Sequence, residues 1–130
     1  DELYTKLIAL NDRDAQAYNN FAYSLVERDE DLEYALTLAE KAIQISPDVS
    51  AYLDTIGWIY YKLSEFEKAK DFIAQALIYD DSSAVILEHY GDVLMSVEEI
   101  DEALIFYNKA LLLDEDNEQL QTKISSYESQ

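Results

Sequence analysis

The chain has 130 residues, which suits a single domain, and its 2 Gly and 1 Pro are too few for the many turns of a β-sandwich or barrel. The formal net charge of −19, from 28 acidic and 9 basic residues, disfavours binding to nucleic-acid phosphates and to anionic membranes. Cysteine is absent, which excludes a disulfide framework, a thiolate nucleophile and a zinc site built on Cys. No window is apolar for long enough to cross a membrane, so we expect a soluble protein of the cytoplasm or periplasm with no direct membrane insertion.

The first predicted element is a helix within residues 1–14, the second helix of a partial repeat. Its apolar residues, Tyr4, Leu7, Ile8 and Leu10, align with the second half of the repeats that follow. The chain is therefore expected to start inside a repeat of a longer protein. The apolar edge that this start would expose offers a route to a homodimer.

Three full repeats are predicted next, at residues 15–49, 50–83 and 84–117. Small residues recur 34 positions apart, at Ala35, Ala69 and Ala103 and at Gly57 and Gly91. Ala22 takes the place of the glycine in the first repeat at a step of 35, so one residue is inserted there, and we place it in the acidic turn 28–31. Between these positions apolar residues recur at helical spacing, which predicts an antiparallel helix pair in each repeat. Such pairs bury their faces only by stacking on their neighbours.

The last predicted element is a capping helix within residues 118–130. Leu120, Ile124 and Tyr127 form one narrow apolar stripe on an otherwise polar segment. A terminal helix with a polar outer face is typical of the end of a repeat array.

The repeat resembles the tetratricopeptide repeat (TPR), whose pattern is W-x2-L-G-x2-Y, then A-x3-F, then an Ala and a Pro within 34 residues. The matching residues are Tyr18, Phe21, Ala22, Leu25, Ala35, Ala39, Ala42 and Pro47, then Leu53, Ile56, Gly57, Tyr60, Ala69, Ile73 and Ala76, then Leu87, Tyr90, Gly91, Leu94, Ala103, Tyr107 and Ala110. The pattern's Trp is replaced in every repeat, and Asp81 and Glu115 stand where the first repeat has Pro47. Residues 53–69 look like repeats common in bacterial members. The resemblance implies an all-α fold, a right-handed superhelix (α-solenoid) of about eight helices.

No catalytic or metal-binding constellation is found, so we expect no enzyme activity, no cofactor and no metal. His89 is the only histidine, which excludes a two-His metal site. Two glycines far apart cannot form a phosphate-binding loop. Asp114, Asp116 and Glu118 alternate like the start of a calcium loop but lack its glycine and its distal Glu.

The resemblance implies that the first helix of each repeat lines a concave face where ligand peptides lie. The candidate groove residues are Asn19, Asn20, Tyr23, Asp54, Trp58, Tyr61, Lys62, Glu88 and Asp92. Neighbouring positions expected to face the groove are Gln16, Val26, Glu27, Thr55, His89, Met95 and Ser96, with Thr122 and Lys123 from the capping helix.

These residue types favour a protein or peptide partner that carries basic or mixed aromatic and basic side chains. Tyr23, Trp58 and Tyr61 are anchors of the kind found at hot spots, and the acids make the groove negative. A carboxylate clamp is disfavoured because only Lys62 supplies a cation. Other interpretations stay open: Trp58 packing between adjacent first helices, His89 as a solvated helix-face residue, and the two Asn residues as plain polar surface.

Three functions fit this pattern: a peptide-binding adaptor, a structural self-association module, and a regulatory arm of a larger enzyme. A hydrophobic outer face would favour self-association. The expected outer positions are largely charged, at Glu67, Lys68, Lys70 and Asp71. The aromatic and amide residues of the groove favour the adaptor.

Overall fold

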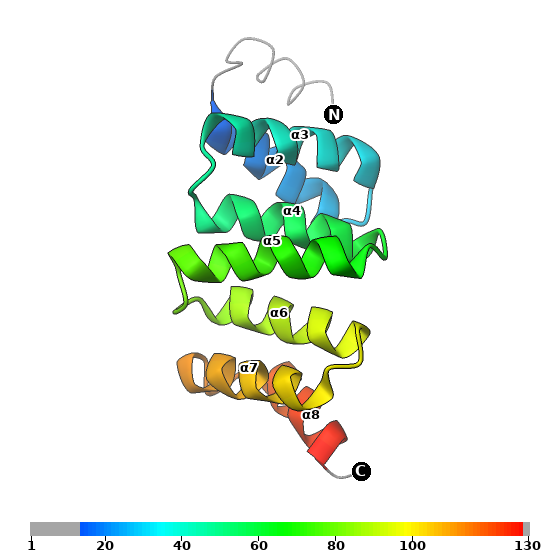
Figure 1. The fold of residues 1–130 in the computed structure, drawn as a ribbon, viewed down its shortest axis with the longest axis vertical. Helices are drawn as coiled ribbons and strands as arrows, with labels where there is room; N and C mark the ends of the chain where they lie inside the picture. The colour runs from blue at the N-terminus through cyan, green and yellow to red at the C-terminus, as the bar shows by residue number, and fades with distance from the viewer. Residues whose placement is uncertain (1–13, 129–130) are drawn as a thin grey trace.

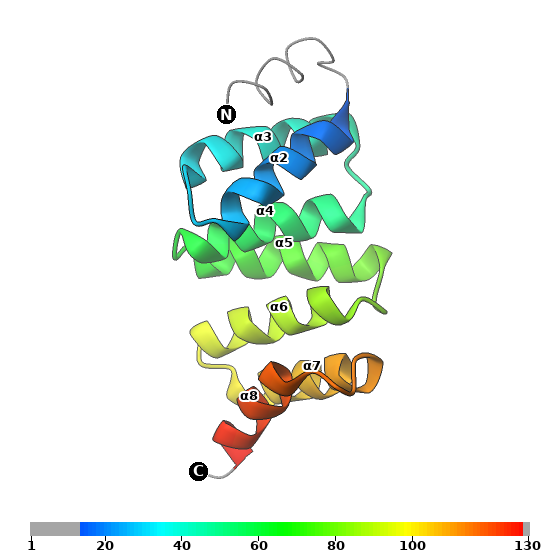
Figure 2. The same ribbon diagram turned by 180° about the vertical axis from the view of Figure 1, so that it is seen from behind.

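The computed structural model describes residues 14–128. Within this part the elements are the α-helices α2 (Ala15–Glu27), α3 (Leu32–Ile45), α4 (Ser50–Lys62), α5 (Phe66–Tyr79), α6 (Ala84–Ser96), α7 (Ile100–Leu113) and α8 (Glu118–Glu128). The helix predicted within residues 1–14 falls outside the described residues, apart from Asp14. Helix pairs follow one another in chain order along the long axis of the molecule (Figure 1). The second helices α3, α5 and α7 lie toward the viewer in Figure 1. In the opposite view, α2 and α8 lie toward the viewer (Figure 2).

Polar side chains cap the free amides at the start of α2, α6 and α8. The carboxylate of Asp14 accepts a hydrogen bond from the amide of Ala17 at 3.0 Å, and the hydroxyl of Ser83 accepts one from Ile86 at 3.3 Å. The side chain of Asn117 accepts from the amide of Leu120 at 3.0 Å, at the start of α8. Capping side chains satisfy amides that have no partner inside the helix.

A residue in the left-handed region follows each first helix, with φ of 53° at Asp29, 63° at Ser64 and 64° at Glu98. Glycine is the usual residue in this conformation because it has no Cβ, but here Asp, Ser and Glu adopt it. The turn after α2 contains four residues, Arg28 to Asp31, and a second left-handed residue, Asp31 with φ 44°. The corresponding turns after α4 and α6 contain three residues each, so the extra residue of the first repeat lies in this turn.

Close packing inside each pair depends on one small residue of the first helix and its partner in the second. Ala22 lies in the same core cluster as Ala39. One repeat later, a Cβ on Gly57 would lie 2.5 Å from Cγ1 of Ile73. In the third pair a Cβ on Gly91 would overlap the ring of Tyr107. The facing side chain on the second helix is larger in each successive pair, from Ala39 to Ile73 to Tyr107. The first helix makes room for the two larger ones with a glycine, which has no Cβ.

The core is divided into three clusters that follow the stack. One joins α2 and α3 with α4, the next joins α4 and α5 with α6, and the third joins α6 and α7 with α8. Leu120 and Ile124 of α8 are buried in the third cluster, so the capping helix closes the apolar end of the last pair. Each pair is thus completed by the helix that follows it, as expected for stacked repeats.

Candidate binding groove

A cleft of about 300 Å³ opens where the first helices and the capping helix meet. Its lining comes from α2, α4, α6 and α8 and consists of Val26, Glu27, Trp58, Lys62, Val85, Glu88, His89, Asp92, Gln119 and Lys123. A neighbouring depression of about 360 Å³ is lined by Tyr61, Asp92, Met95, Ser96, Tyr107, Lys123 and Tyr127. Asp92 and Lys123 line both, and we refer to the two together as the groove.

A stack of three rings forms one wall of the groove. The ring of Trp58 lies 3.8 Å from that of His89 with an interplanar angle of 14°, and 4.5 Å from that of Tyr61 with an angle of 11°. Tyr61 shares α4 with Trp58, whereas His89 comes from α6. Trp58 therefore packs between adjacent first helices and also lines the groove.

His89 is held by a buried carboxylate beneath this wall. Its Nδ1 lies 3.0 Å from Oδ1 and 3.1 Å from Oδ2 of Asp54. Only 13% of the His89 side chain and 9% of the Asp54 side chain are exposed. A carboxylate only accepts hydrogen bonds, so Nδ1 carries a proton and donates to Asp54. His89 is therefore a helix-face residue with little exposure to solvent, because Asp54 and Trp58 cover most of its ring.

The acids at the α6–α8 end of the groove are paired within the protein. The ammonium group of Lys123 lies 2.7 Å from Oε2 of Glu88 and 3.0 Å from Oδ1 of Asp92. The hydroxyl of Tyr107 donates to the same Asp92 oxygen at 2.6 Å. Burial alone would lower the pKa of Lys123, but its hydrogen bonds and the two carboxylates raise the pKa above its usual value. Burial, and then the bond to Asp92, raise the pKa of the Tyr107 phenol.

At the α2–α4 end the charges are arranged differently. Burial raises the pKa of the Tyr23 phenol, and a hydrogen bond to Glu27 and the charge of Asp54 raise it further. The ammonium group of Lys62 lies 3.5 Å from the carboxylate of Asp29, outside the groove, and 5.6 Å from the centroid of Trp58. Among the described residues no cation pairs with Glu27, which is exposed.

Not every predicted residue reaches the groove. Of the nine candidates, Trp58, Tyr61, Lys62, Glu88 and Asp92 line it, and Asp54 lies below it on His89. Asn19 is only 8% exposed, and its side-chain oxygen is buried without a hydrogen-bond partner. Asn20 and Tyr23 are exposed but line neither part of the groove. Neighbouring positions on a helix point in different directions, so Asn19 and Asn20 do not share a face.

Tyr107 and Lys123 contribute more to the groove than the sequence indicated. Tyr107 belongs to a second helix, yet its ring passes the position where Gly91 has no Cβ and bonds to Asp92. The change from Ile73 to Tyr107 opposite a glycine was the available signal. Lys123 was expected to face the groove and lines it, but its ion pairs with Glu88 and Asp92 were not expected.

Two further properties concern the described residues as a whole. In residues 14–128, no three or more His, Cys, Asp or Glu side chains are grouped so that they could hold a metal ion. None of the helices in this range is long and apolar enough to span a bilayer.

Stacked antiparallel helix pairs with a groove along their first helices define an α-solenoid. Residues 51–81 and 84–117, which together make half of the chain, match the tetratricopeptide repeat profile, and the chain belongs to this family. It is 35% identical over 71 residues to a TPR repeat-containing protein of Pseudomonas aeruginosa, covering 55% of this chain and 12% of that protein. The chain spans 12% to 22% of the length of the curated relatives that it matches.

Solved structures agree with the predicted fold. A thermophilic TPR protein of Thermus thermophilus superposes with a TM-score of 0.81 at 26% identity, covering 96% of this chain and 69% of that one. YrrB, described as a TPR protein with an unusual peptide-binding site, gives 0.81 at 27% identity, covering 93% of this chain and 62% of that one. The prediction of an all-α TPR superhelix is confirmed.

Proposed function

We propose that this TPR domain is a non-catalytic interaction module whose groove binds a segment of another protein. The observation that carries the proposal is the wall formed by Tyr61, Trp58 and His89, which presents stacked aromatic faces beside polar groups. Large rings with a polar edge are the residues on which protein contacts most often depend. YrrB, which has a similar fold, is described as having a peptide-binding site, and this supports the same class of function here.

The charges of the groove indicate which side chains a partner segment would carry. Lys123 pairs with both Glu88 and Asp92 and cancels one of their two negative charges, so they attract an incoming cation less than their number suggests. Glu27 is the exposed acid with which a partner's Lys or Arg would pair, and the negative charge of the buried Asp54 would add to the attraction. A segment that combines an aromatic side chain with Lys or Arg would stack on the wall and place its charge at the α2–α4 end.

Trp58 is the only tryptophan, so its fluorescence reports on this wall alone. The test uses short synthetic peptides that combine Tyr or Phe with Lys or Arg, and matched peptides in which Glu replaces the basic residues. We expect saturable changes in Trp58 emission with the basic set only. Glu27→Gln should weaken binding about threefold to tenfold, because a charge-assisted hydrogen bond is lost at an exposed position.

Glu67→Gln is the matched control, since Glu67 is an exposed acid on α5, outside the groove. It should leave the affinity unchanged. Equal losses in both variants would mean that the net charge, not the groove, attracts the peptides, and the proposal would then be abandoned. Light scattering over a range of protein concentrations tests the self-association alternative. A dimer that quenches or shifts Trp58 emission without peptide would favour that function.

A further inference from the structure

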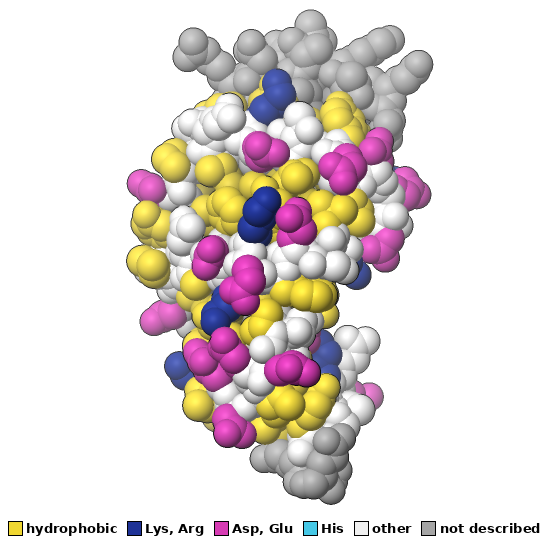
Figure 3. Space-filling view, turned by 45° about the vertical axis from the view of Figure 1, so that its right-hand side comes forward, with side chains coloured by type: hydrophobic (Ala, Val, Ile, Leu, Met, Phe, Trp, Pro, Cys, Tyr) yellow, Lys and Arg dark blue, Asp and Glu magenta, His cyan; other side chains and the backbone are white. Residues whose placement is uncertain are grey.

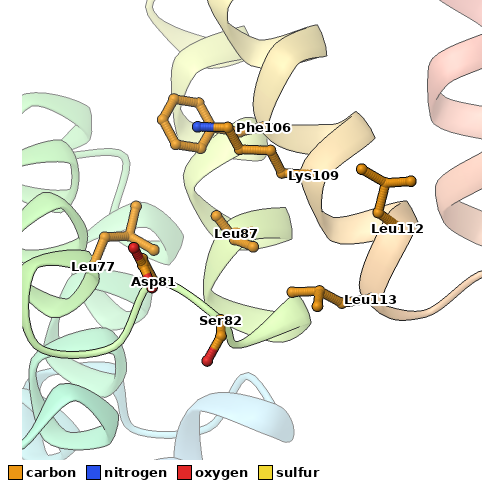
Figure 4. A pocket seen from close by; sticks show the side chains of 8 residues that line it. All are labelled: Leu77, Asp81, Ser82, Leu87, Phe106, Lys109, Leu112 and Leu113. Carbon is orange, nitrogen blue, oxygen red and sulfur yellow. The ribbon is translucent and has the colours of Figure 1, made fainter.

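A second cavity lies away from the groove, between α5, α6 and α7 (Figure 4). Its volume is about 340 Å³, and its lining residues are Leu77, Asp81, Ser82, Leu87, Phe106, Lys109, Leu112 and Leu113, none of which lines the groove. The side chains of five of these residues are hydrophobic. We refer to this cavity as the junction pocket, because it lies where the second helix pair meets the third.

The junction pocket belongs to an outer surface that is more apolar than the sequence suggested. Mainly charged outer positions were expected, but Ile78 is 78% exposed, Leu112 is 75% exposed and Ile105 is 54% exposed. On the face shown in Figure 3, hydrophobic side chains lie exposed between acidic ones. Leu112 also lines an adjoining depression of about 390 Å³ with Asn108, Leu111 and Glu115, so it forms a ridge between two hollows.

The preceding junction, one repeat earlier, differs at the positions that matter. Pro47 stands there where the junction pocket has Asp81, and Tyr79 stands where it has Leu113. The hydroxyl of Tyr79 donates to Oδ1 of Asp48 at 3.1 Å, which ties the end of α5 to the turn before α4. This bridge cannot form at the later junction, since Leu113 has no hydroxyl.

Ser82 stands in the place of Asp48, and its hydroxyl donates to Asp80 instead, at 2.9 Å. The turn is thus bonded within itself and leaves the end of α7 free. The replacement of the proline, the tyrosine and the aspartate therefore leaves the junction pocket without the cross-link that its counterpart has.

Acidic residues outnumber the one basic residue in the lining of the junction pocket and in the turn next to it. Asp81 lines it and is exposed, and the turn that follows Leu113 carries the exposed acids Asp114, Glu115 and Asp116. The one cation in its lining, Lys109, has its ammonium group 4.8 Å from the ring centroid of Phe106. An apolar hollow with acids around it complements an apolar side chain flanked by Lys or Arg. A second copy of a chain with a net charge of −19 would be repelled from such a rim.

We propose that the junction pocket is a second docking site, which takes large apolar side chains of a partner segment whose flanking residues are basic. A volume of about 340 Å³ falls within the usual range for a pocket that holds a compact ligand group. The ridge at Leu112 would lie between two such side chains, one in each hollow. This site is independent of the groove, so a partner could occupy both.

The test uses synthetic amphipathic peptides with Leu or Phe at helical spacing and Lys at the remaining positions, and the same peptides with Glu in place of Lys. Binding is followed by NMR of the leucine methyl groups in the junction pocket and of the Trp58 indole in the groove. We expect the Lys peptides to shift the methyl signals of Leu77, Leu87 and Leu112, and the Glu peptides to shift none of them.

Two variants separate the pocket from general stickiness. Leu112→Gln should lower the affinity for the Lys peptides about tenfold, because an apolar contact is lost. Ile78→Gln, at the equivalent exposed position of the earlier junction, should have no effect. A triple variant with Asp81→Pro, Ser82→Asp and Leu113→Tyr reproduces the residues of the earlier junction and should abolish the Leu77 and Leu87 shifts, with circular dichroism as a check of the fold.

The proposal would be overturned if Lys and Glu peptides bound equally, if Leu112→Gln bound as the wild type does, or if only the Trp58 signal moved. Methyl shifts that grow with protein concentration in the absence of peptide would identify a second copy as the occupant, which also overturns it. Binding at the groove has its own reporter, so failure there leaves the methyl result interpretable.

Discussion

At the α6–α8 end of the groove, Glu88 and Asp92 are held by Lys123 and Tyr107, whereas at the α2–α4 end Glu27 is bonded to a neutral phenol. The first end is fixed by charges that satisfy one another. The second keeps an exposed acid beside an aromatic wall. Acids on the first helices are therefore tied to a cation at one end of the groove and, within residues 14–128, left without one at the other, depending on which cation the fold brings to them.

The largest effect is expected from changing the room that glycine gives to Tyr107. Gly91→Ala should lower the free energy of unfolding by about 3 kcal/mol, because the new methyl group overlaps a ring that is anchored at Asp92. Gly57→Ala should cost less, about 1 kcal/mol, since the aliphatic chain of Ile73 can turn away and alanine favours the helix. Urea denaturation of both variants measures the difference, and equal losses would contradict it.

Removal of Lys123 is expected to have the next largest effect. Lys123→Met leaves Glu88 and Asp92 partly buried without their cation, which should cost about 2 kcal/mol. The same variant should strengthen the binding of Lys-containing peptides in the groove, because the acids become available. Thermal unfolding and the fluorescence titration measure the two effects. A variant as stable as the wild type would show that these ion pairs are no tighter than ordinary surface pairs.

Tyr107→Phe should cost about 1 kcal/mol near neutral pH, since one hydrogen bond to a charged acceptor is lost. The pKa of Tyr107 is raised in the folded state, so the phenol contributes stability below its unfolded pKa and loses it as the pH rises through the folded pKa. From about pH 9 to about pH 11 the wild type should therefore lose stability more steeply than the variant. Denaturation series at several pH values check this, and parallel curves would refute it.

The smallest effect is expected at the other lysine of the groove. The Asp29 side chain is 64% exposed and lies 3.5 Å from the ammonium group of Lys62, so Lys62→Met should change the free energy of unfolding by less than about 0.5 kcal/mol. Its comparison with Lys123→Met is the most direct test of whether the two ends of the groove differ. Similar losses in calorimetry would remove the distinction.

The repeat, the helix pairs and the family followed from the sequence, because they depend on spacing that a single chain displays. Ala35, Ala69 and Ala103 mark close contacts at a fixed period, and the helices that carry them lie where that period predicts. The five candidates Trp58, Tyr61, Lys62, Glu88 and Asp92 reached the groove for the same reason. The division of the groove into an end whose acids pair with Lys123 and an end whose Glu27 pairs with no cation of the described residues was not predictable in this way.

Contacts between residues that are distant in the sequence decided the rest. Asp54 and His89 are 35 residues apart, as are Glu88 and Lys123, and their pairing depends on how far one helix pair is rotated against the next. The reach of Tyr107 past Gly91 and the absence of a bridge at the junction pocket depend on the same packing. The sequence by itself determined the period and the small residues that permit stacking, because these are local requirements. Only the tertiary structure decided which charges meet and which hollows stay open, because stacking brings together side chains whose distance no periodicity encodes.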